Sequence, residues 1–395
     1  MGRISIIGGG PAGLRAAEIA SAAGAEVTLF DAKPSVGRKF LIAGKGGLNL
    51  THGEDLASFV TRYRGPDLAN DFFQKLIGEF TPQDLRAWAA DLGVETFQAS
   101  SGRVYPKALK AAPLLRRWVG RLKENGTRFE MNHRLARIQP GSPIRLEFGQ
   151  GASHETDAVI LALGGGSWPN TGSDGSWTEV LTKIGVQIHP LQPANCGWEH
   201  AWPDEIVEVI EGQPLKNIHV RARNQLAIGE LMLTRYGLEG GAIYQLGHEL
   251  RSQAHPAIAI DFKPTFDEAG LISKLGNPRK DFLKIARSAW KLSDAAHALL
   301  SQKDYPSIES LAREVKHHVI PLTCPRPIEE AISSAGGIGW SELNEDLMLK
   351  KLPGLFAAGE MIDWEAPTGG YLMQGCFATG TRAAHGALAF LRQFD

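Results

Sequence analysis

Short apolar runs and helix-favouring stretches alternate at the start of the chain. Residues 3–7 form a β-branched apolar run, the pattern of a strand buried on both faces of a parallel sheet. The alanine-rich residues 14–23 favour a helix that stops at Gly24. A second apolar run, residues 26–30, closes on Asp31. This order predicts a complete strand–helix–strand unit.

The pattern changes in the middle of the chain. From about Pro190, alternating stretches such as residues 218–222 indicate strands of an antiparallel sheet. Residues 266–315 then become helix-like, and the small-residue-rich residues 372–391 have helical composition near the end. The core positions predicted for the helix-like region are Leu271, Ile272, Leu275, Phe282, Leu283, Ile285 and Leu299.

Length and composition indicate several globular domains and a small-molecule partner. A chain of 395 residues exceeds what one hydrophobic core normally supports. Lys and Arg total 42 against 43 Asp and Glu, so no global field attracts nucleic acid or an anionic membrane. Three cysteines without a C-x-x-C pair suit a reducing cytosol, and no signal peptide or membrane-length apolar run is seen. We expect a cytoplasmic protein, without a metal site at the adjacent His317 and His318.

The glycines after the first predicted strand form a G-x-G-x-x-G motif. Gly8, Gly10 and Gly13 follow a strand and open a helix, and Asp31 lies 18 residues beyond Gly13. Gly8 can make the tight turn, Gly10 can admit a pyrophosphate, and Gly13 can let helix and strand pack closely. Asp31 would accept hydrogen bonds from an adenosine ribose. The motif therefore predicts a dinucleotide site, and a glycine turn without a ligand is the alternative.

Residues 37–51 are too glycine-rich and basic for a core helix. Their glycines would permit close backbone approach to a ligand, and Arg38, Lys39 and Lys45 could neutralise phosphate charge. We interpret this segment as a loop that wraps a ligand. A flexible basic surface loop is the alternative.

This segment resembles the BaiN/YhiN-like family of FAD-dependent oxidoreductases, whose members carry G-R-K-x-L-I-S-G-x-G-R-C-N after the first nucleotide unit. The chain departs from that motif at Ala43, Gly47 and Leu48, which replace Ser, Arg and Cys and remove a polar arm of the loop. The positions that match the motif are Gly37, Arg38, Lys39, Leu41, Ile42, Gly44, Gly46 and Asn49.

Two later segments resemble further parts of such flavoproteins. The buried-strand run 157–163 ends in three glycines, 164–166, like the A-x-G-G segment where the family's chain passes the flavin. A plain strand followed by a turn is the alternative. Residues 354–363 resemble the signature G-L-x-x-A-G-E-x-x-D. There Asp363 is expected to hydrogen-bond the ribityl chain or pyrophosphate waters, with Glu360 in support.

The glycine pair at 369–370 opens the last predicted helix. The helix N-terminus would point at the isoalloxazine, where its dipole favours negative charge on the reduced flavin. An ordinary glycine turn before a packing helix is the alternative. In the middle of the chain, residues 229–240 resemble the family's G-E-x-L-x-T-H-x-G-x-S-G, with Arg235 for His and Glu239 for Ser. Residues 332–338 match the family's return strand.

These observations predict an α/β fold with a Rossmann-like FAD-binding domain of the two-dinucleotide-binding-domain flavoprotein type, an inserted antiparallel β domain and a small helical subdomain. The FAD-binding domain is expected at 1–190 and 335–395. The inserted β domain is expected at 191–264 and 314–334, and a helical lid at 265–313.

The resemblance implies an FAD-dependent oxidoreductase that passes hydride from NAD(P)H through flavin N5 to a small organic acceptor. No second strand–G-x-G-x-x-G–helix unit is present, because the glycines at 164–166 are followed by Trp168-Pro169. NAD(P)H would therefore dock transiently over the flavin. An FAD-binding redox sensor or interaction protein without rapid turnover, and a flavin monooxygenase, are the alternative functions.

We expect Tyr371 and Arg235 near the substrate, with His52 and Tyr105 as weaker candidates and Cys376 as a packing residue. The predicted cofactor-binding residues are Gly8, Gly10, Pro11, Ala12, Gly13, Asp31, Ala32, Lys33, Gly37, Arg38, Lys39, Gly44, Gly46, Asn49, Leu135, Gly164, Gly165, Gly359, Glu360, Asp363, Gly369, Gly370 and Tyr371.

Overall fold

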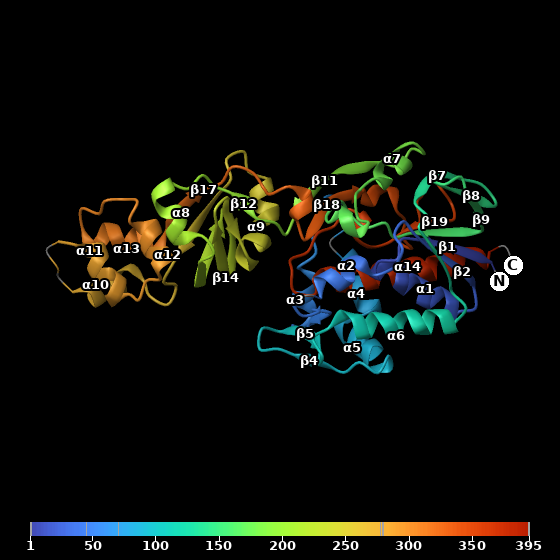
Figure 1. The fold of residues 1–395 in the computed structure, drawn as a ribbon, viewed down its shortest axis with the longest axis horizontal. Coiled ribbons are helices and arrows are strands. Elements are labelled where there is room, and N and C mark those ends of the chain that lie inside the picture. The colour runs from blue at the N-terminus through green and yellow to red at the C-terminus, as the bar shows by residue number, and fades with distance from the viewer. Residues whose placement is uncertain (1, 45, 70, 277, 279, 394–395) are drawn as a thin grey trace. The chain divides into compact units, whose positions relative to one another are not determined.

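Both ends of the chain belong to one compact unit, and the middle forms another. The first unit comprises Met1–Gln192 and Ser333–Asp395, and the second comprises Pro193–Ile332. In the first unit, segments from the start and the end of the chain interleave, as the blue and red ribbons of Figure 1 show. The computed structural model describes residues 2–44, 46–69, 71–276, 278 and 280–393.

A five-stranded parallel sheet forms the centre of the first unit. Its spatial order is β19-β10-β1-β2-β6, and every neighbouring pair is parallel. Strands β1, β10 and β19 are buried almost throughout, because helices cover one side of the sheet and a further β layer the other, whereas the edge strand β6 alternates exposed and half-buried residues. In a parallel sheet the loops after the strands meet at one edge, which is where ligands bind in this class of fold. The strands are β1 (Arg3–Ile7), β2 (Glu26–Asp31), β6 (Arg128–Met131), β10 (Ala158–Leu161) and β19 (Leu355–Ala357).

Helix α1 (Pro11–Ala22) and helix α14 (Tyr371–Leu391) pack side by side against the sheet. Their backbones approach closely, because a Cβ added at Gly380 would lie 2.4 Å from the carbonyl oxygen of Ala12. The Arg15 Nε atom also donates to Thr381 Oγ1 at 3.0 Å. The first and last helices therefore share one packing layer, although their sequences lie at opposite ends of the chain.

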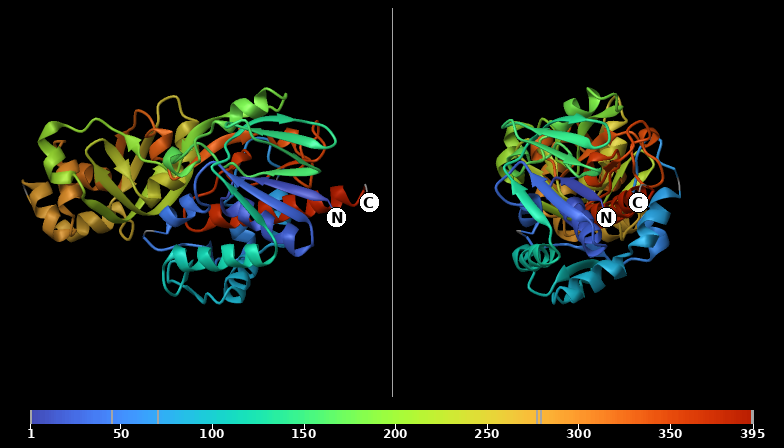
Figure 2. Two further views of the ribbon diagram at one scale, coloured as in Figure 1. Left: turned by 45° about the vertical axis from the view of Figure 1, so that its right-hand side comes forward. Right: turned by 90° about the vertical axis from the view of Figure 1, so that its right-hand side faces the viewer.

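Further elements complete the first unit. Strands β7, β8 and β9 form an antiparallel sheet on the opposite side of the parallel sheet from α6, as Figures 1 and 2 show. Strands β3, β5 and β4 form a second small sheet, and β11 pairs with β18. These elements are α2 (Arg38–Ala43), β3 (Thr51–His52), α3 (Leu56–Val60), α4 (Phe72–Glu79), α5 (Pro82–Asp91), β4 (Thr96–Gln98), β5 (Arg103–Pro106), α6 (Ala111–Glu124), β7 (Leu135–Gln139), β8 (Ile144–Phe148), β9 (Ser153–Thr156), η1 (Pro169–Thr171), α7 (Trp177–Thr182), β11 (Ile188–Ala194), β18 (Ser333–Ile338), η3 (Trp340–Glu342) and η4 (Gly359–Met361).

One expected loop contains a helix. Residues 37–51 were predicted as a ligand-wrapping loop, but Arg38–Ala43 form helix α2. The prediction is wrong there because the glycines lie outside the six helical residues. Gly37 caps the helix with φ of 68°, Gly44 ends it, and the Phe40 side chain is buried.

The second unit contains a six-stranded sheet of order β12-β15-β14-β13-β16-β17, which is antiparallel throughout. The alternating residues 218–222 lie in β13, as the pattern predicted. The elements of this sheet and its helices are β12 (Trp198–Glu199), α8 (Asp204–Ile210), β13 (Pro214–Ala222), β14 (Gln225–Thr234), β15 (Gly237–Glu239), α9 (Gly241–Arg251), β16 (Ala257–Asp261), α10 (Glu268–Leu275), α11 (Phe282–Ala289), α12 (Asp294–Leu300), α13 (Ile308–Lys316), β17 (His318–Pro321) and η2 (Ile328–Glu330).

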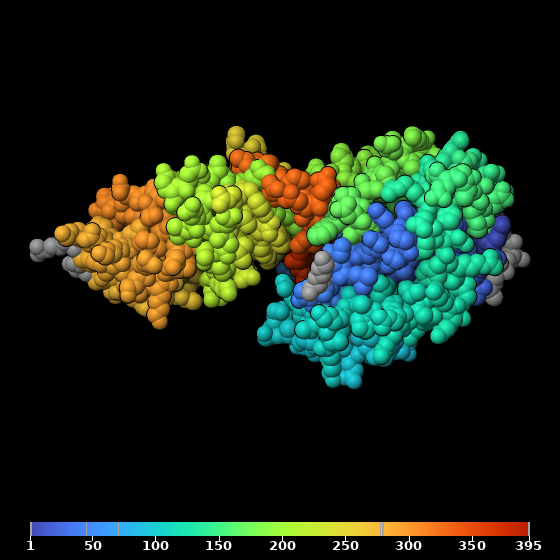
Figure 3. All heavy atoms as spheres, in the orientation of Figure 1, coloured from blue at the N-terminus to red at the C-terminus, as the bar shows by residue number. Residues whose placement is uncertain are grey.

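Helices α10–α13 occupy the region that was expected to be helix-like. They share one hydrophobic cluster with the sheet, and Figure 3 shows the orange helical surface continuous with the yellow-green sheet surface. The prediction of Ile285 as a core position is wrong, because Ile285 is 40% exposed. The buried face of α11 instead runs through Phe282, Ala286 and Trp290, and Ile285 lies off that stripe.

The predicted α/β class, with a parallel sheet and a separate antiparallel sheet, is confirmed. Across the described part of the chain, no helix is both long and apolar enough to cross a membrane.

Candidate cofactor site

A pocket opens at the edge of the parallel sheet where the strands end. It encloses about 990 Å³ between protein atoms, its open mouth included. It is lined by Cys376 and by parts of residues 7–12, 30–39, 133–135, 162–177 and 358–360. All of these residues belong to the first unit, so the pocket is complete within it.

The three glycines of the first motif have different surroundings. A Cβ added at Gly8, whose φ is 110°, would lie 2.2 Å from the Ala162 carbonyl oxygen. One added at Gly13 would lie 1.9 Å from the Gly8 carbonyl oxygen. Gly10 lines the pocket, and a Cβ there would meet no described atom within 4 Å. Gly8 and Gly13 thus permit tight backbone packing, while Gly10 leaves open space beside the N-terminus of α1. Pro11 and Ala12, the first residues of that helix, also line the pocket.

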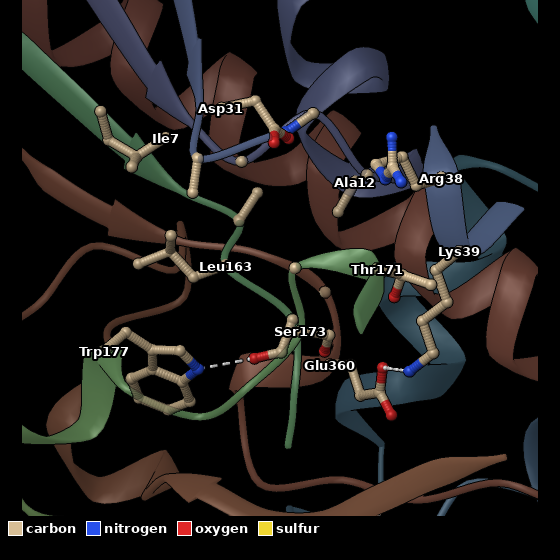
Figure 4. A pocket seen from close by; sticks show the side chains of 18 of the residues that line it. Ile7, Ala12, Asp31, Arg38, Lys39, Leu163, Thr171, Ser173, Trp177 and Glu360 are labelled. Carbon is tan, nitrogen blue, oxygen red and sulfur yellow. Dashed lines mark hydrogen bonds and ion pairs between the residues drawn. The ribbon is translucent and has the colours of Figure 1, made fainter. Parts of the chain in front are cut away.

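Asp31 ends β2 and lines the pocket from the other side of the glycine turn (Figure 4). Its two carboxylate oxygens accept the backbone N–H groups of Gly9 and Lys33, each at 2.8 Å. Burial raises the pKa of Asp31, and the two backbone hydrogen bonds oppose that shift. Ala32 lines the pocket beside it, whereas the Lys33 side chain lies against Gly172 outside the lining.

Arg38 provides a donor that is not satisfied by the protein. Its side chain lines the pocket, and Nε is buried without a hydrogen-bond partner among the described residues. At the other end of the side chain, Nη1 makes a long contact of 3.4 Å with Ser35 Oγ. Gly37 ties this segment to the glycine turn, because its N–H donates to the Gly9 carbonyl at 2.8 Å. An orphaned guanidinium donor in the same pocket as the open space at Gly10 suits an anionic ligand.

Lys39 and Glu360 form an ion pair in the pocket wall, drawn as a dashed line in Figure 4. Lys39 Nζ lies 2.8 Å from Glu360 Oε2 and donates to Ser167 Oγ at 2.7 Å. The other oxygen of Glu360 accepts the Ser334 backbone N–H at 2.8 Å. Lys39, expected to neutralise phosphate, is therefore paired with a carboxylate of the protein.

Glu360 lines the pocket, whereas Asp363, the residue expected to contact the cofactor, does not. Asp363 is 3% exposed and is absent from the pocket lining. One of its oxygens pairs with His189 Nδ1 at 2.6 Å, and the other accepts the Gly336 N–H at 3.0 Å. Glu360, the expected supporting residue, lines the pocket. Both oxygens of Asp363 are engaged within the protein, as are both oxygens of Asp31 and of Glu360, so contact of Asp363 with a cofactor stays a prediction.

Leu135, Gly164 and Gly359, which are among the predicted cofactor-binding residues, line the pocket. Gly165 is not part of the lining. A Cβ there would lie 2.1 Å from Ser334 Oγ, so the glycine allows the two segments to pack closely. Gly359, with φ of 78°, brings the end of β19 against Ala12 of helix α1.

The distal part of the basic segment lies apart from the pocket lining. Gly44 is a packing glycine, because a Cβ there would lie 2.6 Å from Ala111 Cβ. Gly46 faces open space, and the Asn49 Oδ1 atom is buried without a partner among the described residues. Lys45 lies outside the described residues.

The N-terminus of α14 is packed against protein. A Cβ added at Gly370, whose φ is 100°, would lie 2.5 Å from Thr51 backbone atoms, and Gly369 has φ of 128°. The Tyr371 hydroxyl donates to Glu54 Oε1 at 2.6 Å, and its ring stacks on His52 at 5.3 Å. Burial, followed by the Glu54 carboxylate, raises the pKa of Tyr371. None of these residues lines the pocket.

The remaining substrate candidates lie elsewhere. Arg235 belongs to the second unit, where its side chain is 66% exposed and pairs with Glu211 at 2.7 Å. Tyr105 packs near Phe97, with ring centroids 5.9 Å apart, and does not line the pocket. Contact of either residue with a substrate stays a prediction.

Several pocket residues were missed from the sequence. Cys376 packs against the hydrophobic core, as expected, and it also lines the pocket, where burial raises the pKa of its thiol to about 12. Trp177 lines the pocket and donates to the Gly164 carbonyl at 2.8 Å, and Arg134 pairs with Asp174. Only the place of Cys376, early in a helix after two glycines, could have indicated it. No group of three or more metal-ligating side chains occurs in the part of the chain that the structure describes.

Comparison with known proteins identifies relatives that span the chain. A family model described as the HI0933-like protein Rossmann domain matches residues 2–386. The 3-dehydro-bile acid delta(4,6)-reductase of Clostridium scindens is 26% identical over 98% of this chain and 99% of its own. The ribosomal RNA dihydrouridine synthase of Escherichia coli is 22% identical over 97% of both chains. The solved 3-ketosteroid-delta4-(5alpha)-dehydrogenase of Rhodococcus jostii has the same fold, with a TM-score of 0.52 and 16% identity over 98% of this chain and 96% of its own.

Proposed function

The chain belongs to the HI0933-like Rossmann family, and we propose that, as an FAD-dependent oxidoreductase of this family, it transfers hydride from NAD(P)H to a conjugated carbon–carbon double bond. Family membership confirms the resemblance to the BaiN/YhiN-like oxidoreductases. The identities of the donor and the acceptor are proposals. Both depend on bound FAD, and the pocket is the structural evidence for a site that could hold it.

The observation that carries the proposal is that one pocket contains both the open space at Gly10 and the Arg38 side chain, whose Nε has no hydrogen-bond partner among the described residues. We propose that the N-terminus of α1 and Arg38 hold the pyrophosphate of FAD, because free N–H groups and a guanidinium both favour negative charge. Asp31, at the end of β2, would accept hydrogen bonds from the hydroxyls of the adenosine ribose. Bound FAD would supply hydride transfer, and the chain contributes binding, orientation and charge.

The donor is proposed to be a nicotinamide that docks transiently. The sequence has one glycine motif of the dinucleotide type, and the described strands of the second unit form an antiparallel sheet rather than a second Rossmann unit. A resident nicotinamide would need such a unit, so the proposal assigns NAD(P)H a temporary place above the flavin.

The acceptor class follows from the chemistry that the relatives' names have in common. A delta(4,6)-reductase and a dihydrouridine synthase both add hydrogen across a carbon–carbon double bond. In a cyclic enone or a uracil, a neighbouring carbonyl accepts the charge that develops when hydride adds to that bond. We therefore propose an acceptor with a double bond conjugated to a carbonyl, presented either by a small molecule or by RNA.

A local excess of positive charge supports uridine in RNA as the second candidate acceptor. Helix α6 exposes Arg116 and Lys123, although the whole chain has nearly balanced charge. Residues 103–128 contain one acidic residue, Glu124, against eight basic residues, which are Arg103, Lys107, Lys110, Arg116, Arg117, Arg121, Lys123 and Arg128. Three of the eight pair with acidic residues from outside the segment, so the excess of positive charge is carried by the other five. The expectation that nucleic acid is no partner rested on the net charge, which does not report such local clusters.

The proposal is tested by separating the two half-reactions. Stopped-flow mixing of the FAD-loaded protein with NADH or NADPH should bleach the flavin absorbance within seconds. The reduced protein should then be reoxidised anaerobically by a cyclic enone or by a uridine-containing RNA, and the product that forms tells the two acceptors apart. Slow reduction by both nucleotides would favour a redox sensor. Rapid reoxidation by oxygen with a hydroxylated product would favour a monooxygenase.

A further inference from the structure

The ion pair between Lys39 and Glu360 belongs to a closed ring of hydrogen bonds. Lys39 Nζ contacts Glu360 Oε2 at 2.8 Å and Ser167 Oγ at 2.7 Å. Glu360 Oε1 accepts the Ser334 N–H at 2.8 Å, and Ser334 Oγ accepts the N–H of Gly166 at 2.8 Å. Since Gly166 adjoins Ser167, the ring closes on itself. It joins helix α2, the segment after β10, the segment after β19 and the first residues of strand β18.

This ring lies at the end of the pocket away from Asp31. Glu360 follows β19, Asp31 ends β2, and β19 is three positions from β2 in the sheet. With neighbouring strands about 4.8 Å apart, the two strand ends are separated by about 14 Å. Figure 4 shows Asp31 and the Lys39–Glu360 pair in separate parts of the pocket. If Asp31 marks the adenosine, the ring lies toward the flavin.

Both charges of the pair are partly shielded from water. The side chains of Lys39 and Glu360 are 29% and 12% exposed. Charges in such a position act more strongly on a neighbouring group than surface charges do, because solvent and salt screen them less. The neighbouring thiol of Cys376, which lines the same wall, has its pKa raised to about 12 and so carries no charge near neutral pH.

We propose that Lys39 is a positioning residue that raises the reduction potential of the bound flavin, and that Glu360 holds Lys39 in place and moderates its charge. The inference rests on the proposed function, because it requires FAD in the pocket. A cation at this end favours the cofactor state that carries more negative charge. The Glu360 carboxylate acts in the opposite direction, so the potential reflects the balance between the two.

A merely structural pair would behave differently from an electrostatic one. Loss of either partner would then weaken the same ring and shift FAD affinity in the same direction, with little change in potential. An electrostatic pair gives potential shifts of opposite sign. Lys39→Met keeps most of the side-chain length, and Glu360→Gln keeps an oxygen for the Ser334 N–H, so each variant removes charge with little change of shape.

The experiment measures the midpoint potential of the FAD-loaded protein by dye-coupled reduction, beside FAD affinity and thermal stability. Lys39→Met should lower the potential, and Glu360→Gln should raise it. Each shift should correspond to about a tenfold change in the relative affinity for reduced over oxidised flavin, or about 30 mV for a two-electron couple. Lys39→Arg should stay close to the parent protein, and the matched control Lys183→Met, an exposed position on the end of α7, should not move the potential.

The outcomes separate this inference from the proposed function. If the parent protein binds no FAD, the proposed function fails. If FAD binds but both variants shift the potential in the same direction, or neither shifts it, the electrostatic role of the pair is overturned. Should Lys39→Met not fold, the Glu360→Gln shift still decides, because an electrostatic pair predicts a rise in potential and a structural ring predicts none, while Lys39→Arg, which keeps the charge, should leave the potential unchanged.

Discussion

Two glycine turns that look alike in sequence have different surroundings in the structure. The turn at residues 8–13 opens helix α1, and at Gly10 an added Cβ would enter the pocket. The turn at residues 369–370 opens helix α14, and at Gly370 an added Cβ would collide with the backbone of Thr51. The first glycine leaves space for a ligand, and the second lets two chain segments touch. A glycine before a helix is thus a ligand signal only when the missing side chain faces a cavity.

The largest effect is expected at the open turn. Gly10 has φ of −79° and ψ of −179°, a conformation that valine adopts without strain, and an added Cβ would meet no described atom within 4 Å outside the neighbouring residues. Gly10→Val should therefore fold normally and weaken FAD binding by about 1000-fold, because the side chain occupies the proposed pyrophosphate space. Fluorescence titration of the apoprotein with FAD measures this.

The control for that variant is Gly78→Val in helix α4, another glycine whose added Cβ would meet no described atom within 4 Å and which is not part of the pocket lining. It should bind FAD like the parent protein. A Gly10→Val protein that is yellow and fully loaded would contradict the assignment of the pocket.

The packed turn should respond in stability instead. Gly370→Ala places a side chain at φ of 100° and within 2.5 Å of Thr51 backbone atoms. Backbone strain and overpacking together should lower the free energy of unfolding by about 3 kcal/mol. Urea denaturation followed by tryptophan fluorescence measures the loss. The fraction that remains folded should bind FAD with unchanged affinity, and a loss of affinity without a loss of stability would show that this turn, too, faces the cofactor.

The sequence could predict the local geometry of the first turn but not the surroundings of the second. Gly8, Gly10, Gly13 and Asp31 belong to one strand–helix–strand unit, so their relative placement follows from chain connectivity, whereas Gly370 packs against Thr51, which is distant in sequence. The pair of Lys39 and Glu360 joins residues 321 positions apart, and no local pattern encodes such a contact.

The pH dependence of FAD affinity tests the proposed role of Asp31 at the pocket. Burial raises its pKa, so on acidification the carboxylate takes up a proton at a pH above the ordinary aspartate value of about 3.9. The protonated group accepts ribose hydroxyls poorly, and FAD affinity should therefore fall, by about tenfold, as the pH drops through the raised pKa. The affinity of Asp31→Asn should be low at neutral pH and nearly flat over the same range. Identical pH profiles for the two proteins would remove Asp31 from the site.

The smallest effect is expected from Tyr371→Phe at the packed end. Its hydroxyl donates to Glu54, so the variant should lose about 1 kcal/mol of unfolding free energy. Reduction of the flavin by NADH or NADPH should stay within about threefold of the parent rate, because the hydroxyl has a partner away from the pocket lining. Stopped-flow absorbance measures that rate. A drop of a hundredfold would instead place the hydroxyl at the reacting centre.

Tertiary contacts also decide what other sequence-based predictions could not. Asp363 matched a signature, and the structure engages its carboxylate with His189 and Gly336, so its contact with the cofactor stays a prediction. Residues 38–43 looked like loop because glycines flank them, yet the six residues between the glycines form a helix. Composition and motif describe what a residue can do, whereas its partners depend on tertiary packing.

The central claim is that the pocket beside Gly10 binds FAD, and the absorbance spectrum of the purified protein after incubation with FAD and gel filtration tests it most directly. The account predicts a yellow protein with one flavin per chain, and a colourless Gly10→Val variant that is still folded. A parent protein that stays colourless, or a variant that carries as much flavin as the parent, would contradict it.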